Sequence, residues 1–164
     1  MTVIPKFSTY WDTATTVTIL GLLLSQPHAG FMIFIVWLLL LPWLVVRIVA
    51  AYKKPEQRPL IITRASLWIV MSIIVLSSHA YMHFRTRANA QIIVDSILAY
   101  EVKNGSYPES LEAVGITRKQ MQSALGLSGY SYKEGRASLF YAATYIPFLT
   151  EQYDFAERRW TQSD

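Results

Sequence analysis

Two long blocks of apolar residues dominate the first half of the chain. Residues 31–51 read FMIFIVWLLLLPWLVVRIVAA, and residues 65–84 read ASLWIVMSIIVLSSHAYMHF. Each block matches the roughly 20 helical residues that cross the hydrocarbon core of a bilayer. We therefore expect two membrane-spanning helices, the first with a kink at Pro42 that neighbouring helices can accommodate.

A shorter apolar segment precedes these blocks. Residues 13–25 have a length that suits a short span, and equally an interfacial or re-entrant helix. Extending the segment back through Tyr10 and Trp11 places aromatic residues at one membrane interface. This favours a short span over residues 10–26, followed by a tight turn before the next helix.

The connector between the two long blocks is basic. It reads YKKPEQRPLIITR over residues 52–64. Its basic residues are Lys53, Lys54, Arg58 and Arg64. Because Lys and Arg concentrate in cytoplasmic loops close to the membrane, we expect this loop to be cytoplasmic. The segment after residue 84 then lies on the opposite side, although Arg85 and Arg87 add positive charge there.

Beyond residue 84 the pattern changes to that of an amphipathic helix. The apolar positions are Ala90, Ile93, Val94, Ile97, Leu98 and Tyr100. Spacings of three and four put most of them on one helical face, and no helix breaker separates them from the preceding block. We expect the last spanning helix to continue to about residue 102, with Gly105 as its C-cap and Pro108 preventing its resumption.

The remaining residues predict a second short helix and antiparallel strands. The expected elements are a helix over 117–125, a hairpin with arms over 130–133 and 137–146, and either one or two further strands over 152–155 and 159–161. Thr117 is the expected N-cap of the helix, and Glu134-Gly135 is the expected turn of a β-hairpin. The chain is thus expected to be an α+β membrane protein, with a membrane domain over 1–84 and a small α+β head over 85–164.

Composition agrees with this organisation. The chain has 164 residues, of which 52% are hydrophobic and 16% are charged. It has no cysteine, which excludes a disulfide framework and any Cys-based metal or redox site. The net charge of +4 comes from basic residues close to the apolar blocks, which indicates membrane orientation and no nucleic-acid partner. We expect a multi-pass protein of a bacterial inner membrane with a periplasmic C-terminal domain.

The helix with Ala88, Ile92, Ile97 and Tyr100 is followed by NGSYPESLEAV and then by the Tyr-rich hairpin. This succession resembles the head of type IV pilins and type II secretion pseudopilins. The resemblance implies a membrane-rooted helix packed on a sheet and displayed outside the inner membrane. The prepilin cleavage motif is lacking, since Ile35 stands where that motif has Glu. A fixed membrane protein with a pilin-like head is therefore expected.

Candidate chemistry is sparse. His79 and His83 lie four residues apart, a spacing that can ligate a metal or contribute to a haem site. No Asp, Glu or Cys accompanies them, which favours interface residues or helix contacts. The head has no His to activate its serines, and its carboxylates are expected on the solvated surface; they are Asp95, Glu101, Glu109, Glu112, Glu134, Glu151, Asp154 and Glu157. We expect no enzyme activity, no metal and no cofactor.

Aromatic residues are the enriched feature of the head. Alternation along strands sends about half of them into the core. Exposed Tyr, Trp and Arg side chains suit a protein-binding surface. The candidate protein-binding residues are Tyr130, Tyr132, Tyr145, Arg158, Arg159 and Trp160.

These patterns predict an inner-membrane protein that displays a protein-binding head in the periplasm. Its most concrete form is an immunity protein that guards the producing cell against an envelope-targeting toxin. One alternative is an accessory, pseudopilin-like subunit of a secretion or pilus system. The other alternative is a membrane redox or metal protein that uses His79 and His83. The expected partners are the lipid bilayer and either a toxin or a secretion component.

Overall fold

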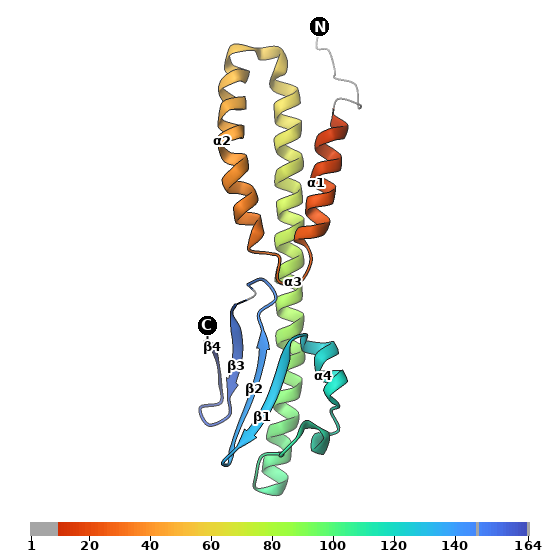
Figure 1. The fold of residues 1–164 in the computed structure, drawn as a ribbon, viewed down its shortest axis with the longest axis vertical. Coiled ribbons are helices and arrows are strands. Elements are labelled where there is room, and N and C mark those ends of the chain that lie inside the picture. The colour runs from red at the N-terminus through yellow and green to blue at the C-terminus, as the bar shows by residue number, and fades with distance from the viewer. Residues whose placement is uncertain (1–9, 147, 164) are drawn as a thin grey trace. The chain divides into compact units, whose positions relative to one another are not determined.

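The computed structural model describes residues 10–146 and 148–163. The chain divides into two compact units, Met1–Ala80 and Tyr81–Asp164. We call them the N-terminal unit and the head. The boundary between them falls at Ala80–Tyr81, slightly before the expected one after residue 84. Helix α3, Arg58–Asn104, contributes to both units (Figure 1).

The N-terminal unit is helical. It contains α1, Trp11–Leu24, α2, Met32–Lys53, and the first part of α3. Helix α2 and the helical stretch Pro55–Asn104 are long and apolar enough to cross a membrane. Helix α1 has 14 residues, so at about 1.5 Å per residue it is roughly 21 Å long, short of the hydrocarbon thickness of about 30 Å.

The connector between α2 and α3 is shorter than the sequence indicates. Helix α2 continues to Lys53, a 3-10 turn η2 occupies Pro55–Gln57, and α3 begins at Arg58. The expected loop over residues 52–64 is therefore wrong at both ends, because residues 52–53 belong to α2 and residues 58–64 belong to α3. Pro59 lies in the first turn of α3, where the missing N–H of proline costs no helical hydrogen bond.

The helices of the N-terminal unit share a small apolar core. Its buried residues are Val17, Leu24, Ile33, Met71 and Val75. Within α2, Ile33 is the buried residue, whereas Phe34, Leu38 and Leu39 are 72%, 70% and 73% exposed. An apolar surface of this extent is the one expected of helices that have lipid as their solvent.

The head contains a four-stranded antiparallel sheet with strand order β1-β2-β3-β4. The strands are β1, Ser128–Lys133, β2, Arg136–Ala142, β3, Thr150–Asp154, and β4, Arg159–Ser163. The predicted hairpin is confirmed. Glu134 and Gly135 between β1 and β2 have φ values of 52° and 80°, as a two-residue hairpin turn requires.

The C-terminal part of α3 lies along one face of this sheet (Figure 1). Its predicted apolar face is confirmed, because Ala90, Ile93, Val94 and Ile97 are buried in the head's core. From the sheet, Leu139, Tyr141 and Tyr153 join them. The helix ends at Asn104, and the N–H of Gly105 donates to the Glu101 carbonyl at 2.8 Å.

Two short helices complete the head. They are the 3-10 helix η3, Leu111–Val114, and α4, Arg118–Leu125. The predicted cap of α4 is confirmed: Thr117 and Gln120 form a capping box, in which each side chain accepts a hydrogen bond from the other residue's backbone N–H. The α+β class of the chain and its antiparallel sheet are thus as the sequence predicts.

Candidate protein-binding site

Strand β1 is an open edge of the sheet, since it pairs with β2 alone. The Ala142 N–H donates to the Leu127 carbonyl at 2.8 Å at the start of this ladder. Hydrogen-bonded positions alternate along an antiparallel ladder, so the backbone groups that face away from β2 are those of Ser128, Tyr130 and Tyr132. Among the residues that the structure describes, no strand pairs with this outer edge.

A groove of about 360 Å³ opens beside β1. Its lining residues are Glu109, Ser110, Leu111, Glu112, Arg118, Met121, Ser128, Gly129 and Tyr130. The apolar residues Leu111 and Met121 are buried, whereas Glu109, Glu112 and Arg118 are exposed. The groove therefore places an unpaired strand edge between an apolar floor and a charged rim, an arrangement that suits an extended peptide segment.

Tyr130 braces the edge strand from inside. Its hydroxyl donates to the Pro108 carbonyl at 2.6 Å, and its ring packs against the head's core. Burial raises the pKa of Tyr130 to about 12, so this hydroxyl is a donor at all physiological pH values. This hydrogen bond links β1 to the segment that follows α3. Both segments line the groove, so the bond stabilises its shape.

The rim of the groove stays charged. Hydrogen bonds from the backbone N–H of Glu112 and from the Ser110 side chain hold the pKa of the Glu112 carboxyl below its usual range. Glu112 is therefore ionised at neutral pH. With Glu109 and Arg118 beside it, the groove offers charges of both signs to a bound segment.

The other predicted aromatic residues lie against the interior of the head. Tyr132 is half-buried and packs on the core. Tyr145 is half-buried, with its ring centroid 5.6 Å from that of His83. The Trp160 indole N–H donates to the Gln91 side chain at 3.0 Å. Their rings are thus part of the head's packing, and the role of these residues in protein binding stays a prediction.

Arg158 and Arg159 are exposed in and after the turn between β3 and β4. Arg159 forms an ion pair with Glu157 at 2.5 Å. Because β4 is the edge of the sheet opposite to β1, the structure does not bring Arg158, Arg159 and Trp160 together with Tyr130 and Tyr132. The six candidates do not form one surface.

Glu151 corrects the expectation that the carboxylates are solvated. It is 4% exposed, and its Oε2 lies 2.7 Å from Arg87 Nη1 of α3. The Gln162 amide donates to Oε1 at 2.6 Å. Strand alternation places Glu151 on the same face as Tyr153, toward α3. In the sequence, the signal for a buried Glu151 is the alternation of inward and outward side chains along β3, with a period of two residues.

His79 is a contact within the N-terminal unit. Its Nε2 lies 2.7 Å from the Leu24 carbonyl oxygen, and because a carbonyl only accepts, Nε2 carries the proton. This bond satisfies one of the last carbonyls of α1. Gly30 lies so close that a Cβ there would be 3.0 Å from the imidazole. His79 of α3 thus contacts both ends of the turn between α1 and α2 and stabilises it.

His83 belongs to the head, where its ring meets those of Phe84 and Tyr145. Within the described ranges, no group of three or more His, Cys, Asp and Glu residues is placed to hold a metal ion. A metal or redox role for His79 and His83 stays a prediction from their spacing.

Comparison with protein-family models, curated proteins and solved structures found no match to this chain. The pilin-like character of the head therefore stays a prediction from its sequence.

Proposed function

We propose that this chain is a multi-pass protein of a bacterial inner membrane that displays a protein-binding head in the periplasm. The head receives an extended segment of its partner along β1. The observation that carries this proposal is the unpaired edge of β1, which opens into the groove lined by Leu111, Met121 and Tyr130. Addition of a strand to an open sheet edge is a recurrent binding mode, in which main-chain hydrogen bonds supply affinity and side-chain pockets supply specificity.

The orientation rests on the connector between α2 and α3. Lys53, Lys54 and Arg58 gather at this turn, and the Arg58 Nε donates to the Ala51 carbonyl at 3.2 Å, at the end of α2. A basic turn of this kind between two spans is typical of the cytoplasmic side. With α2 and α3 as spans, the head lies on the opposite side. Helix α1 is proposed as a third, short span that packs on Met71 of α3.

The groove's chemistry describes the partner. An extended segment that alternates apolar and charged side chains would meet Leu111 and Met121 with the first and Glu109, Glu112 and Arg118 with the second. A toxin that the head neutralises and a secretion component that it docks would both use such a segment. The groove's lining offers carboxylates and a guanidinium to the charged side chains of a bound segment, which supports a binding role.

A pair of substitutions at one position tests strand addition. The N–H of Ser128 points away from β2, so Ser128→Pro removes an edge donor and leaves the ladder intact. Ser128→Ala is the matched control, because it keeps the N–H and removes only the hydroxyl. We expect the proline variant to lose capture of the partner from solubilised membranes and the alanine variant to retain it. Equal capture by both variants would overturn binding along β1.

Site-specific photocrosslinking identifies the partner. A photoreactive residue at Arg118, in the groove, is expected to crosslink it, whereas one at Arg136, exposed outside the groove, is not. An envelope-directed toxin in the crosslinked band supports the immunity role, and a pilus or secretion subunit supports the accessory role. Crosslinks of equal yield from both positions would contradict a site in the groove.

Sidedness has its own test. A phosphatase that is active only in the periplasm and a fluorescent protein that matures only in the cytosol are each fused after Asp164. We expect phosphatase activity and no fluorescence. The reverse pattern would refute the periplasmic head.

A further inference from the structure

The exposed large apolar residues of the sheet and its connections gather at one end of the head. They are Leu127, Phe140, Ile146 and Phe148, with exposures of 72%, 41%, 37% and 81%. Leu127 precedes β1, and Ile146 and Phe148 lie between β2 and β3. The antiparallel register brings the start of β1, the end of β2 and the start of β3 to the same end of the sheet. We call this the apolar end.

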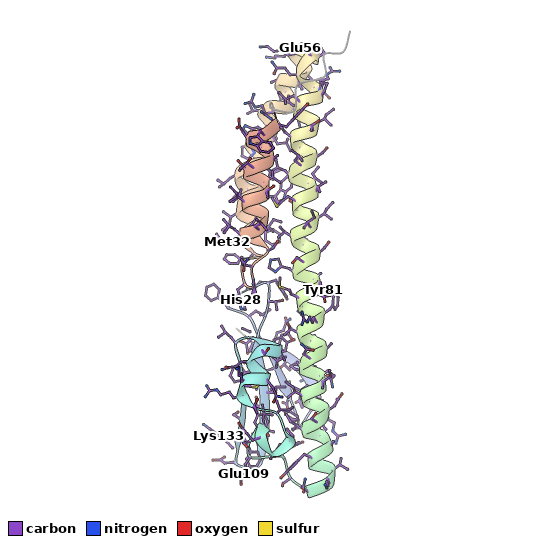
Figure 2. All side chains as sticks on the ribbon, turned by 90° about the vertical axis from the view of Figure 1, so that its right-hand side faces the viewer. His28, Met32, Glu56, Tyr81, Glu109 and Lys133 are labelled. Atoms are coloured by element: carbon purple, nitrogen blue, oxygen red, sulfur yellow. The ribbon has the colours of Figure 1, made fainter. Side chains whose placement is uncertain are left out.

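The opposite end of the sheet is charged. The β1–β2 and β3–β4 turns both lie there, and their exposed charged residues are Lys133, Glu134, Arg136, Glu157, Arg158 and Arg159. Figure 2 labels Lys133 at this end of the head and Tyr81 at the other. The head therefore has a polarity along its strands, from apolar to charged.

The apolar end lies beside the part of α3 where the long apolar block finishes. Tyr145, from the connection between β2 and β3, contacts His83 of α3 with ring centroids 5.6 Å apart. On the same helical turn, Tyr81 and Phe84 are 65% and 70% exposed. Aromatic side chains at the end of a spanning helix are typical of the membrane–water interface, and the exposed Arg85 follows directly.

We propose that the apolar end of the head inserts into the interfacial layer of the bilayer, with Ile146 and Phe148 as its deepest side chains. This inference rests on the proposed function, in which α3 spans the membrane. Lipid is the occupant because the Tyr145–His83 contact places the apolar end beside the turn of α3 that exposes Tyr81 and Phe84. The charged end then remains in water.

Single-cysteine labelling tests the insertion, because the chain has no cysteine of its own. An environment-sensitive fluorophore is attached at Phe148→Cys in the full chain, reconstituted in phosphatidylcholine–phosphatidylglycerol vesicles. Val102→Cys is the matched control: it is apolar, 83% exposed against 81% for Phe148, and lies toward the other end of the head's helix. Ile73→Cys, 58% exposed within the apolar block, reports the span itself.

We expect nitroxide-labelled lipid to quench the label at position 148 several-fold more strongly than the label at position 102, and a water-soluble quencher to show the reverse order. Because Phe148→Cys removes one anchor, Ile146→Cys repeats the measurement with Phe148 in place. If the labels at 146 and 148 behave like that at 102 while Ile73→Cys is quenched by lipid, the insertion is refuted and the span stands. If lipid quenches none of them, the membrane span and the insertion both fail.

Discussion

The ring of Phe140 covers Gly129 on the neighbouring strand, so that a Cβ on Gly129 would lie 2.5 Å from Phe140 Cζ. The two residues are register partners between β1 and β2. Since Leu139 and Tyr141 point to the core, Phe140 points to the sheet face that α3 does not cover. An aromatic ring over a cross-strand glycine shields the backbone of an edge strand. The pair thus supports the strand that carries the proposed binding edge.

Gly129→Ala should destabilise the head by about 1–2 kcal/mol, because the methyl group forces the Phe140 ring aside. In a chain that already carries Phe140→Ala, the same change should cost little. Urea unfolding of the detergent-solubilised chain, analysed as a double-mutant cycle, measures the coupling. Additive effects of the two substitutions would show that the ring does not restrain position 129.

The stability of the head should fall in alkaline solution. Burial holds the pKa of Tyr130 at about 12, above its unfolded value near 10. Because the pKa of Tyr130 is raised in the folded state, the neutral hydroxyl contributes its full stabilisation below about pH 10. That stabilisation is lost as the pH rises through about 12. Tyr130→Phe should flatten this part of the profile and cost about 1 kcal/mol at neutral pH through the lost bond to Pro108. Urea midpoints between pH 8 and about 12 measure both effects; an unchanged profile in the variant would contradict the assignment.

Removing Arg87 should leave the buried Glu151 carboxylate without its counter-charge. We expect Arg87→Leu to destabilise the head by about 2–3 kcal/mol, less than the loss of a partner from a fully buried pair, because Arg87 is itself 35% exposed. Adding Glu151→Gln should restore part of this loss, since an amide needs no cation.

Arg85→Leu is the control for the loss of Arg87, because Arg85 is exposed on the same helix. Its effect on the urea midpoint should stay within about 0.5 kcal/mol. Equal losses of stability in the two arginine variants would indicate that the net charge of the head, and not the ion pair with Glu151, determines its stability.

Two glycines of the N-terminal unit should respond differently to alanine. At Gly30 the new methyl group meets the imidazole of His79, which its bond to Leu24 holds in place, so Gly30→Ala should lower the melting temperature. At Gly21 the nearest atom is Met71 Cγ at 3.1 Å, in a flexible side chain that can move away. Gly21→Ala should therefore be neutral or stabilising. Thermal unfolding in detergent measures the melting temperatures of the two variants. An equal decrease in both would contradict a fixed position of the His79 side chain.

Local signals in the sequence predict most elements of the fold. The uninterrupted run from the apolar block through Ile97 predicts that α3 continues into the head, and Thr117 marks the start of α4. The Glu134-Gly135 turn fixes the hairpin. In each case the residues that determine the element are close together in the sequence, so the element can be recognised from a short segment of the chain.

Long-range contacts account for what the sequence does not reveal. Tyr130 and Tyr132 are notable for their aromatic side chains, yet they also supply the free backbone edge of the candidate site, which depends on the order of the strands. The groove's apolar floor comes from Leu111 and Met121, which tertiary packing brings beside β1. The contact of His79 with Leu24 likewise joins residues from separate helices.

The helical side of the head's core is synthesised before any of the strands that cover it. Val94 and Ile97 of α3 pack with Leu139 and Tyr153, which leave the ribosome much later. During synthesis this apolar stripe of α3 therefore stays uncovered until β2 and β3 have followed. A chaperone that binds extended or helical apolar segments could bind this stripe in that interval. A quality-control protease could recognise the same stripe in any chain whose final strands do not join the sheet.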